Sequence, residues 1–447
     1  MTPLPSSHQK KYLDAQGSEL VKASAAGLAA RVLSAGAVLA FSVLLARTLG
    51  VADSGLFFLA VAVVSAISVL SRAGLDNAIV RYSAAAIASD RWGDVSALYR
   101  RSIVLVSAIS GVFAVAIYTG AYWIATTLFL KPALADPLQT LAVCILPITL
   151  IMMHCRYLQS QKRIAFALYF QSALIPTLSI IAIVLLPFSW SLGNIAITYT
   201  GAGVLGAILA ATVWLSRAKI VGFPRTQYDS RKFFSSGLTL IPSDLVNKVL
   251  QPWAALICLG FWSTETDAGL FAAAWRIAAL VTFALIPVNS FAAPKMAALW
   301  HEGDVVSLRR ISQQATLLMI IVAAPMLIAI VLFPELIMSV FGDDFRIAAE
   351  ILLVLAAAQV VNVVTGPVRS LLLMTGNEQD HRSASLAGGI TILVGCFVLV
   401  PAYGGLGAAW SVAASLVATN MSAAVFVWQR LGFLPVGLAK SVQEGPR

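Results

Sequence analysis

Twelve long apolar runs organise this sequence, and most charged residues fall in the short segments between them. The approximate limits of the runs are 22–46, 54–80, 103–128, 137–158, 167–188, 193–215, 234–260, 268–292, 313–340, 347–374, 384–401 and 405–429. A helix that crosses the hydrocarbon core of a bilayer needs about 20 such residues. Charged residues make up only 11% of the chain, whereas soluble proteins carry about 25%. We therefore expect an all-α integral membrane protein with twelve transmembrane helices.

The lysines and arginines are distributed unevenly between the two sides of these spans. About 24 of the 30 lie with both termini and the even-numbered loops, whereas Arg47, Lys131 and Arg346 lie on the other side. Because cytoplasmic loops carry the excess of Lys and Arg, both termini are predicted to be cytoplasmic. This distribution explains the net charge of +10 without nucleic acid as a partner.

The two halves of the chain share short motifs at a nearly constant offset. GLF occurs at 55–57 and at 269–271, and GDV occurs at 93–95 and at 303–305. We predict two six-helix bundles that point the same way, related by a pseudo-twofold axis along the membrane normal. The predicted parts are a cytoplasmic tail at 1–21, bundles at 22–216 and 234–430, a cytoplasmic linker at 217–233 and a cytoplasmic tail at 431–447.

The sequence contains no clear motif for a cofactor, a metal ion or an enzymatic reaction. GAGVLG at 201–206 fits the pattern of a dinucleotide-binding loop, but it lies inside an apolar span with no strand before it, so close helix packing explains it better. The four cysteines have neither paired nor metal-ligand spacing. The outer loops are too short for the catalytic domain of a membrane glycosyltransferase. We predict a transporter without a cofactor, not an enzyme.

Three cations lie near the middle of predicted spans, where a charge costs about 2.5–3.5 kcal/mol to insert. They are Arg31 in span 1, Lys248 in span 7 and Arg276 in span 8. Arg31 and Arg276 have no acid three or four residues away, so water, a neighbouring helix or an anionic substrate must compensate them. These three cations, and Arg72 in span 2, are candidate ligands of an anionic headgroup.

Two carboxylates lie close in sequence to these cations. Asp76 follows Arg72 by four residues, and Asp244 precedes Lys248 by four. This spacing places each pair on one helix face, where the two charges can neutralise each other in a structural role. Alternatively, Asp76 or Asp244 couples transport to H⁺ or Na⁺. The sequence leaves both interpretations open.

Pro242 and Pro252 bracket Asp244 and Lys248 in span 7. A proline inside a helix frees a carbonyl group and bends the helix. Span 7 is therefore predicted to be the most distorted helix and a candidate gate, with a static kink that aids packing as the alternative.

Four motifs near the N-terminus resemble a known family. They are LARTLG at 45–50, SGLF at 54–57, RAGLD at 72–76 and AIVRY at 78–82. Together they resemble the opening of polysaccharide transporters, the O-antigen and exopolysaccharide flippases of the multidrug/oligosaccharidyl-lipid/polysaccharide exporter superfamily. The resemblance implies a V-shaped pair of six-helix bundles, as in the MATE exporters, in a bacterial inner membrane. Relatives that flip the peptidoglycan precursor have an additional pair of spans, which this chain lacks.

The resemblance also implies a substrate and a mechanism. The substrate is a polyprenyl diphosphate that carries an oligosaccharide repeat unit of O-antigen, capsule or exopolysaccharide, moved between leaflets by alternating access. The four candidate cations would hold its diphosphate, which suits the guanidinium group. Membrane lipids, a polysaccharide polymerase and glycosyltransferases are the expected partners. Two other functions stay open: a multidrug or small-solute cation-coupled antiporter of the same superfamily, and a membrane scaffold for glycosyltransferases.

Overall fold

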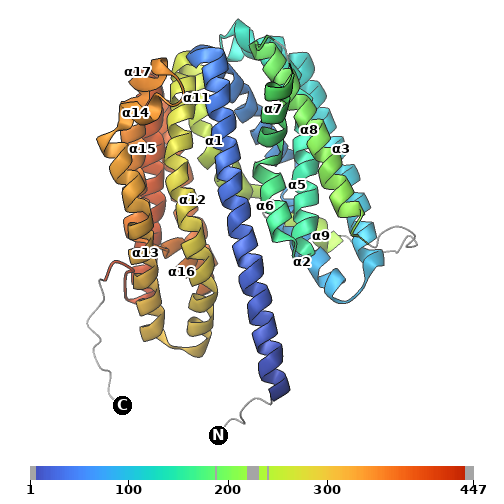
Figure 1. Cartoon of the computed structure of the whole chain (residues 1–447), viewed down its shortest axis with the longest axis vertical. Helices are drawn as coiled ribbons and strands as arrows, with labels where there is room; N and C mark the ends of the chain where they lie inside the picture. The colour runs from blue at the N-terminus through green and yellow to red at the C-terminus, as the bar shows by residue number, and fades with distance from the viewer. Residues whose placement is uncertain (1–6, 187–188, 219–230, 239–240, 438–447) are drawn as a thin grey trace.

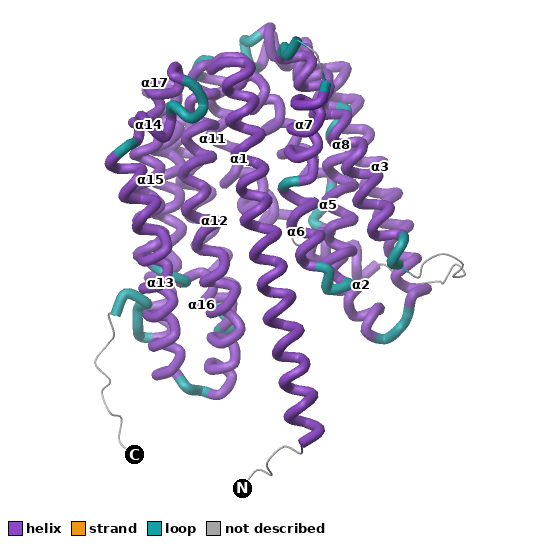
Figure 2. Tube along the Cα trace, viewed as in Figure 1, coloured by secondary structure: helices purple, strands orange, loops and turns teal. Residues whose placement is uncertain are grey.

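The computed structural model of the chain describes residues 7–186, 189–218, 231–238 and 241–437. Helices make up nearly all of this part of the chain, and it contains no β-sheet (Figure 2). Among these residues, eight helices are long and apolar enough to cross a membrane, and two bent pairs of shorter helices raise the number to ten. The predicted all-helical membrane architecture is confirmed.

Two of these helices each contain two predicted spans. α1 (Ser7–Ser71) is kinked at Gly50, where φ is 75°, and α17 (Glu378–Leu431) is kinked at Gly404, where φ is 51°. Glycine adopts a positive φ without the strain that a Cβ atom introduces. When each kinked helix is counted as two crossings, the described helices account for the twelve predicted spans.

The remaining helices of the first half follow α1 in chain order. They are α2 (Leu75–Ala88), α3 (Trp92–Trp123), the π-helix η1 (Ile124–Leu128), the 3₁₀-helix η2 (Pro132–Leu134), α4 (Ala135–Ala142), α5 (Ile145–Ser160), α6 (Ile164–Ser172), α7 (Leu174–Leu185) and α8 (Leu192–Leu215). The pairs α4 with α5 and α6 with α7 are bent by 45° and 56°. Each bent pair corresponds to one predicted span.

The second half begins with a span that contains a π-helical segment, and it ends with α17. Its other helices are α9 (Arg231–Leu238), α10 (Ile241–Asp244), the π-helix η3 (Leu245–Leu250), α11 (Gln251–Trp262), α12 (Glu265–Glu302), α13 (Val305–Leu332), α14 (Pro334–Met338), the 3₁₀-helix η4 (Asp343–Ala348), α15 (Ala349–Thr365) and α16 (Val368–Met374). α9 packs against α2 of the first half, whereas α11 packs against α17. The first span of the second half therefore reaches from one bundle to the other.

The helices form two bundles that meet at one end and diverge toward the end at which α1 begins (Figure 1). α1 and α12 make the largest contact between the bundles. One hydrophobic cluster joins both bundles and includes Phe57 and Phe271, whereas a second, which includes Tyr157 and Trp214, contains residues of the first half and of α9 only. The bundles therefore share a core where they meet and are separate where they diverge.

Two predicted boundaries fall partly outside the described residues. The predicted linker at 217–233 lies mostly in the gap at 219–230, and the C-terminal tail is described only as far as residue 437. Residues 7–21 of the predicted N-terminal tail are helical and continue into the first span of α1.

Candidate functional site

A cavity of about 480 Å³ lies between the bundles. Its walls come from α1, α5, α6, α7 and α8 of the first half and from η3, α11 and α12 of the second half. Four cations line it: Arg72, Arg156, Lys248 and Arg276. Most of the other lining side chains are apolar or aromatic, which is typical of a ligand site with a few polar groups that fix orientation.

The break between α1 and α2 positions Asp76. Gly74 adopts a left-handed conformation (φ 69°) immediately before α2, and Asp76 lies in the first turn of that helix. A Cβ atom on Gly74 would collide with the carbonyl oxygen of Gly237 in α9. Glycine is therefore required both for the turn and for the close approach of α9. The amino end of α2 favours a carboxylate at this point.

Three cations converge on Asp76, whose residue surface is only 1% exposed. Arg72 Nε lies 3.0 Å from Oδ1, Lys248 Nζ lies 2.7 Å from Oδ2, and Arg156 Nε lies 3.7 Å from Oδ1. Lys248 Nζ also lies 2.8 Å from Asp244 Oδ2. We call these five residues the charge cluster. It holds three cations and two carboxylates, so it retains one positive charge.

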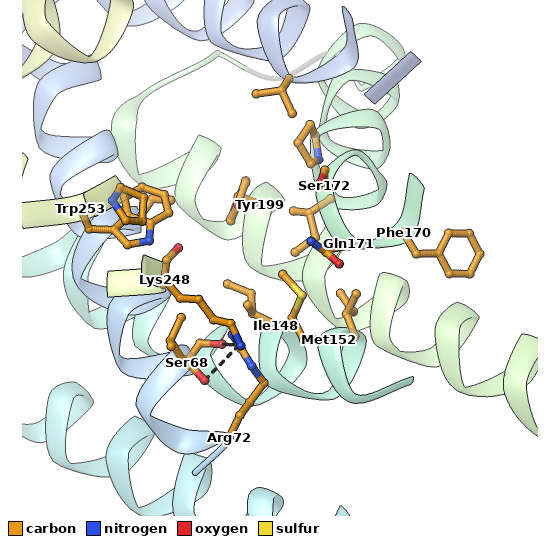
Figure 3. A pocket seen from close by; sticks show the side chains of 18 of the residues that line it. Ser68, Arg72, Ile148, Met152, Phe170, Gln171, Ser172, Tyr199, Lys248 and Trp253 are labelled. Atoms are coloured by element: carbon orange, nitrogen blue, oxygen red, sulfur yellow. Dashed lines mark hydrogen bonds between the residues drawn. The ribbon is translucent and has the colours of Figure 1, made fainter. Parts of the chain in front are cut away.

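The charge cluster connects the bundles. Arg72 and Asp76 belong to the first half, Lys248 belongs to η3, and the bond from Lys248 to Asp76 joins residues 172 positions apart. Arg72 also donates from Nη1 to the carbonyl and the hydroxyl oxygens of Ser68, each at 3.2 Å (Figure 3). Both ion pairs expected from the sequence spacing form, although Arg72 lies in the turn between α1 and α2 and not on one helix with Asp76, and Lys248 links the two pairs into one network.

Span 7 departs from α-helical geometry where Asp244 and Lys248 lie. α10 ends at Asp244, the π-helix η3 carries Lys248, and α11 starts at Gln251 with Pro252 in its first turn. Pro242 lies in α10, so the two prolines do bracket the distorted segment. π-helical turns occur frequently at functional sites. Whether this segment moves as a gate stays a prediction.

The other two predicted cations, Arg276 and Arg31, lie in different places: one lines the cavity and the other does not. Arg276 of α12 lines the cavity, and its Cζ lies 5.6 Å from the centre of the Phe58 ring. Arg31 of α1 is half-buried and is not part of the cavity wall. Of the predicted headgroup ligands, the cavity therefore brings together Arg72, Lys248 and Arg276, and it leaves out Arg31.

The bundles are closed tightly at the end where they meet. A Cβ atom on Gly55 would collide with the carbonyl oxygen of Glu265, and one on Gly269 would collide with the carbonyl oxygen of Val51. These glycines open the two GLF motifs found in the sequence. The repeated motif therefore marks the crossing of α1 and α12, where only glycine lets the two backbones approach.

Two basic side chains bridge the bundles at the same closed end. Lys131 Nζ donates to the carbonyl oxygens of Gly260 and Ser263 at 2.8 and 2.6 Å, and Arg47 Nε donates to the carbonyl oxygen of Val340 at 2.7 Å. Burial lowers the pKa of Lys131, and the carboxylate of Glu265 opposes this shift. The carbonyl oxygens thus stabilise the charged ammonium group of Lys131, whose charged form burial alone disfavours.

Sequence reasoning missed Arg156 and the contacts of Lys131. Arg156 lies two residues inside the predicted end of span 4, where a cation is readily explained as an orientation signal. For Lys131, the sequence predicts only a position in a loop on the outer side of the membrane. Neither residue has a sequence neighbour that identifies its partner, because their partners lie 80 and 129 or more positions away.

The sequence is similar to two protein families. The family described as polysaccharide biosynthesis protein matches residues 20–300, and the MatE family matches residues 256–398. No curated protein matches the sequence.

Solved structures of transporters share the fold. The lipid II flippase MurJ in an inward closed conformation has a TM-score of 0.72 at 14% sequence identity, covering 89% of this chain and 86% of that chain. An inward-facing multidrug resistance MATE family transporter of the MOP superfamily has a TM-score of 0.69 at 15% identity, covering 90% and 94%. An outward-facing MATE family transporter of that superfamily has a TM-score of 0.64 at 16% identity, covering 92% and 95%. At these identities the likeness concerns the fold, and it confirms the predicted pair of bundles.

Proposed function

Because the chain belongs to the polysaccharide biosynthesis protein family, we propose that it is a flippase for a polyprenyl-diphosphate-linked oligosaccharide in a bacterial inner membrane. The oligosaccharide is a repeat unit of O-antigen, capsule or exopolysaccharide. Glycosyltransferases would supply this lipid, and a polymerase would consume the sugar after transfer.

The charge cluster is the observation that carries the proposal. Arg72, Arg156 and Lys248 outnumber the two carboxylates that face them, and all three line the cavity. A diphosphate brings the anionic oxygens that such a group of donors binds, and guanidinium forks suit phosphate geometry. The hydrocarbon tail stays in the bilayer while the cluster holds the headgroup.

Binding and movement are linked through Lys248. A diphosphate competes with Asp76 and Asp244 for the ammonium group of Lys248, and the bond from Lys248 to Asp76 joins the two bundles. Release of that bond frees the bundles to move relative to each other. Asp76 or Asp244, once released, is a candidate site for a coupled H⁺ or Na⁺.

Both termini lie on the cytoplasmic side in this proposal, as the distribution of Lys and Arg indicates. The bundles diverge toward the end at which α1 begins (Figure 1), so the cavity faces the cytoplasm and the crossing at Gly55 closes the outer side. The higher similarity to the inward-facing MATE structure than to the outward-facing one supports this orientation.

The charge of the cavity favours this function over an antiporter for cationic drugs. A site for organic cations needs uncompensated acids, whereas the carboxylates of Asp76 and Asp244 are already paired with cations. A cationic drug would meet the excess positive charge of the charge cluster and of Arg276.

Transfer of a fluorescent polyprenyl diphosphate disaccharide in reconstituted vesicles tests the proposal. A membrane-impermeant quencher reports the fraction of lipid in the outer leaflet. The double variant Arg156→Gln with Lys248→Gln is expected to slow transfer at least roughly tenfold, because hydrogen bonds to charged groups contribute about 1.5–3 kcal/mol each. Lys162→Gln, an exposed cation outside this cavity, is the matched control with unchanged transfer. Equal rates for the double variant and the wild type contradict the proposal.

A further inference from the structure

Arg276 differs from the other cations of the cavity because no acid compensates it in the part of the chain that the structure describes. It makes no ion pair or hydrogen bond with a described residue, whereas each cation of the charge cluster faces Asp76. Its described neighbours are the face of Phe58 and Tyr199, neither of which carries an acid that pairs with it. A cation–π contact contributes about 0.5–2 kcal/mol, less than the several kcal/mol that it costs to take an ion out of water. Arg276 therefore has capacity for an anion that enters the cavity.

Arg276 and the charge cluster lie at opposite ends of the cavity. Phe58, which Arg276 contacts, and Ser68, which Arg72 contacts, are both on α1 beyond its kink. Ten residues of α-helix separate them by about 15 Å. Phe58 is one turn from the glycine crossing, so Arg276 occupies the closed end of the cavity. A diphosphate bound at the charge cluster is too short to reach it.

Aromatic side chains in the cavity wall suit sugar rings. Tyr199 and Trp253 line the cavity and lie on the far side of Lys248 from Arg72 (Figure 3). Aromatic faces pack against the apolar faces of sugars, while the Tyr and Trp polar atoms remain available for hydroxyl groups. Ser65 and Gln171 add polar groups to the lining of the cavity.

We propose that the oligosaccharide carried by this protein contains an acidic sugar, whose carboxylate pairs with Arg276 while the diphosphate occupies the charge cluster. This inference rests on the proposed function and adds the chemical class of the sugar. The guanidinium fork binds a carboxylate through two parallel hydrogen bonds. The cavity then recognises its cargo at two points, and the neutral part of the oligosaccharide lies along the aromatic wall.

Binding to the full-length protein in nanodiscs tests this inference with three synthetic lipids. One is a short polyprenyl diphosphate with a disaccharide that ends in glucuronic acid, the second ends in glucose instead, and the third carries no sugar. The wild type is expected to bind the acidic lipid at least roughly tenfold more tightly than the glucose lipid. Arg276→Gln is expected to remove this preference and to keep the affinity for the glucose lipid.

Two further variants keep the test decisive. Arg276→Lys retains the charge without the fork, so a reduced preference for the acidic lipid is expected even if the Gln variant does not fold. Arg369→Gln removes an arginine of the same bundle that does not line the cavity, and it is expected to retain the full preference.

The possible failures are distinguishable. Equal affinities of the wild type for the acidic and glucose lipids, or a preference unchanged by Arg276→Gln, would overturn this inference and leave the proposed function standing. If none of the three diphosphate lipids binds, the proposed function itself fails.

Discussion

At the scale of single residues, Asp76 organises the charges of the cavity. Its carboxylate is almost fully buried and faces cations from the end of α1, from α5 and from η3. Removal of one partner from a buried ion network leaves the other charges uncompensated, which costs far more than loss of a pair at the surface. Asp76 is thus as important to the folded cavity as the cations that surround it.

We therefore expect Asp76→Asn to destabilise the protein by about 3–5 kcal/mol, because Arg72 then lies buried without a carboxylate. Thermal unfolding of the purified protein in detergent measures this effect. Asp380→Asn is the matched control, because Asp380 pairs with an exposed Arg430 at the surface, and it is expected to unfold almost like the wild type. The same unfolding temperature for the two variants would show that the charge cluster does not stabilise the fold.

At the scale of helices, close glycine contacts determine how the two bundles meet. Gly55 and Gly269 have carbonyl oxygens of the opposite bundle where a Cβ atom would lie. No side chain can be accommodated at this crossing without moving one backbone away from the other. α1 and α12 therefore pack more closely here than larger residues would allow.

Gly55→Ala is accordingly expected to lower stability by about 1–3 kcal/mol, the usual cost of overpacking. The melting temperature in detergent reports the change. Gly111→Ala in α3 is a matched helical control, because a Cβ atom there meets nothing within 4 Å, and it is expected to leave stability equal or slightly raised. An unchanged melting temperature for Gly55→Ala would mean that α1 and α12 move apart at this crossing without loss of stability.

The sequence predicted helices well and contacts between helices poorly. Length and hydropathy alone define a membrane span, so the apolar runs corresponded to the observed crossings, including the pairs joined at Gly50 and Gly404. The pairing of Arg72 with Asp76 was predictable because both lie on one stretch of chain. The bond from Lys248 to Asp76 depends on how the bundles pack, which local spacing does not encode.

The same difference between local sequence features and packing explains which predicted site residues line the cavity. Depth in a span identified Arg31 and Arg276 equally, but only Arg276 lines the cavity, because the α1 part of the cavity wall begins at Val38, about two helical turns after Arg31. The repeated GLF motif was visible in the sequence as a sign of duplication. Its role at the crossing appears only when the two copies are placed face to face.

At the scale of the whole molecule, the two bundles are joined at two places, the closed end and the charge cluster. Arg47 and Lys131 hold the bundles together at the closed end through carbonyl oxygens, and Lys248 joins the bundles within the cavity. In the proposed function, transfer of the cargo requires the contacts at the closed end to break. Once the bundles separate, water can replace the carbonyl oxygens around both cations, so neither charge is left buried without a partner.

The most direct test of the account is lipid transfer by a protein whose closed end is locked. The variant Arg47→Cys with Val340→Cys places two thiols at an exposed contact between the bundles, and the four native cysteines are buried, so a short bismaleimide joins the new pair selectively. In vesicles, the locked protein is expected to bind the polyprenyl diphosphate disaccharide but not to move it between leaflets, while each single-cysteine variant treated with the same reagent moves it normally. Transfer at the wild-type rate by the locked protein would contradict alternating access through this cavity.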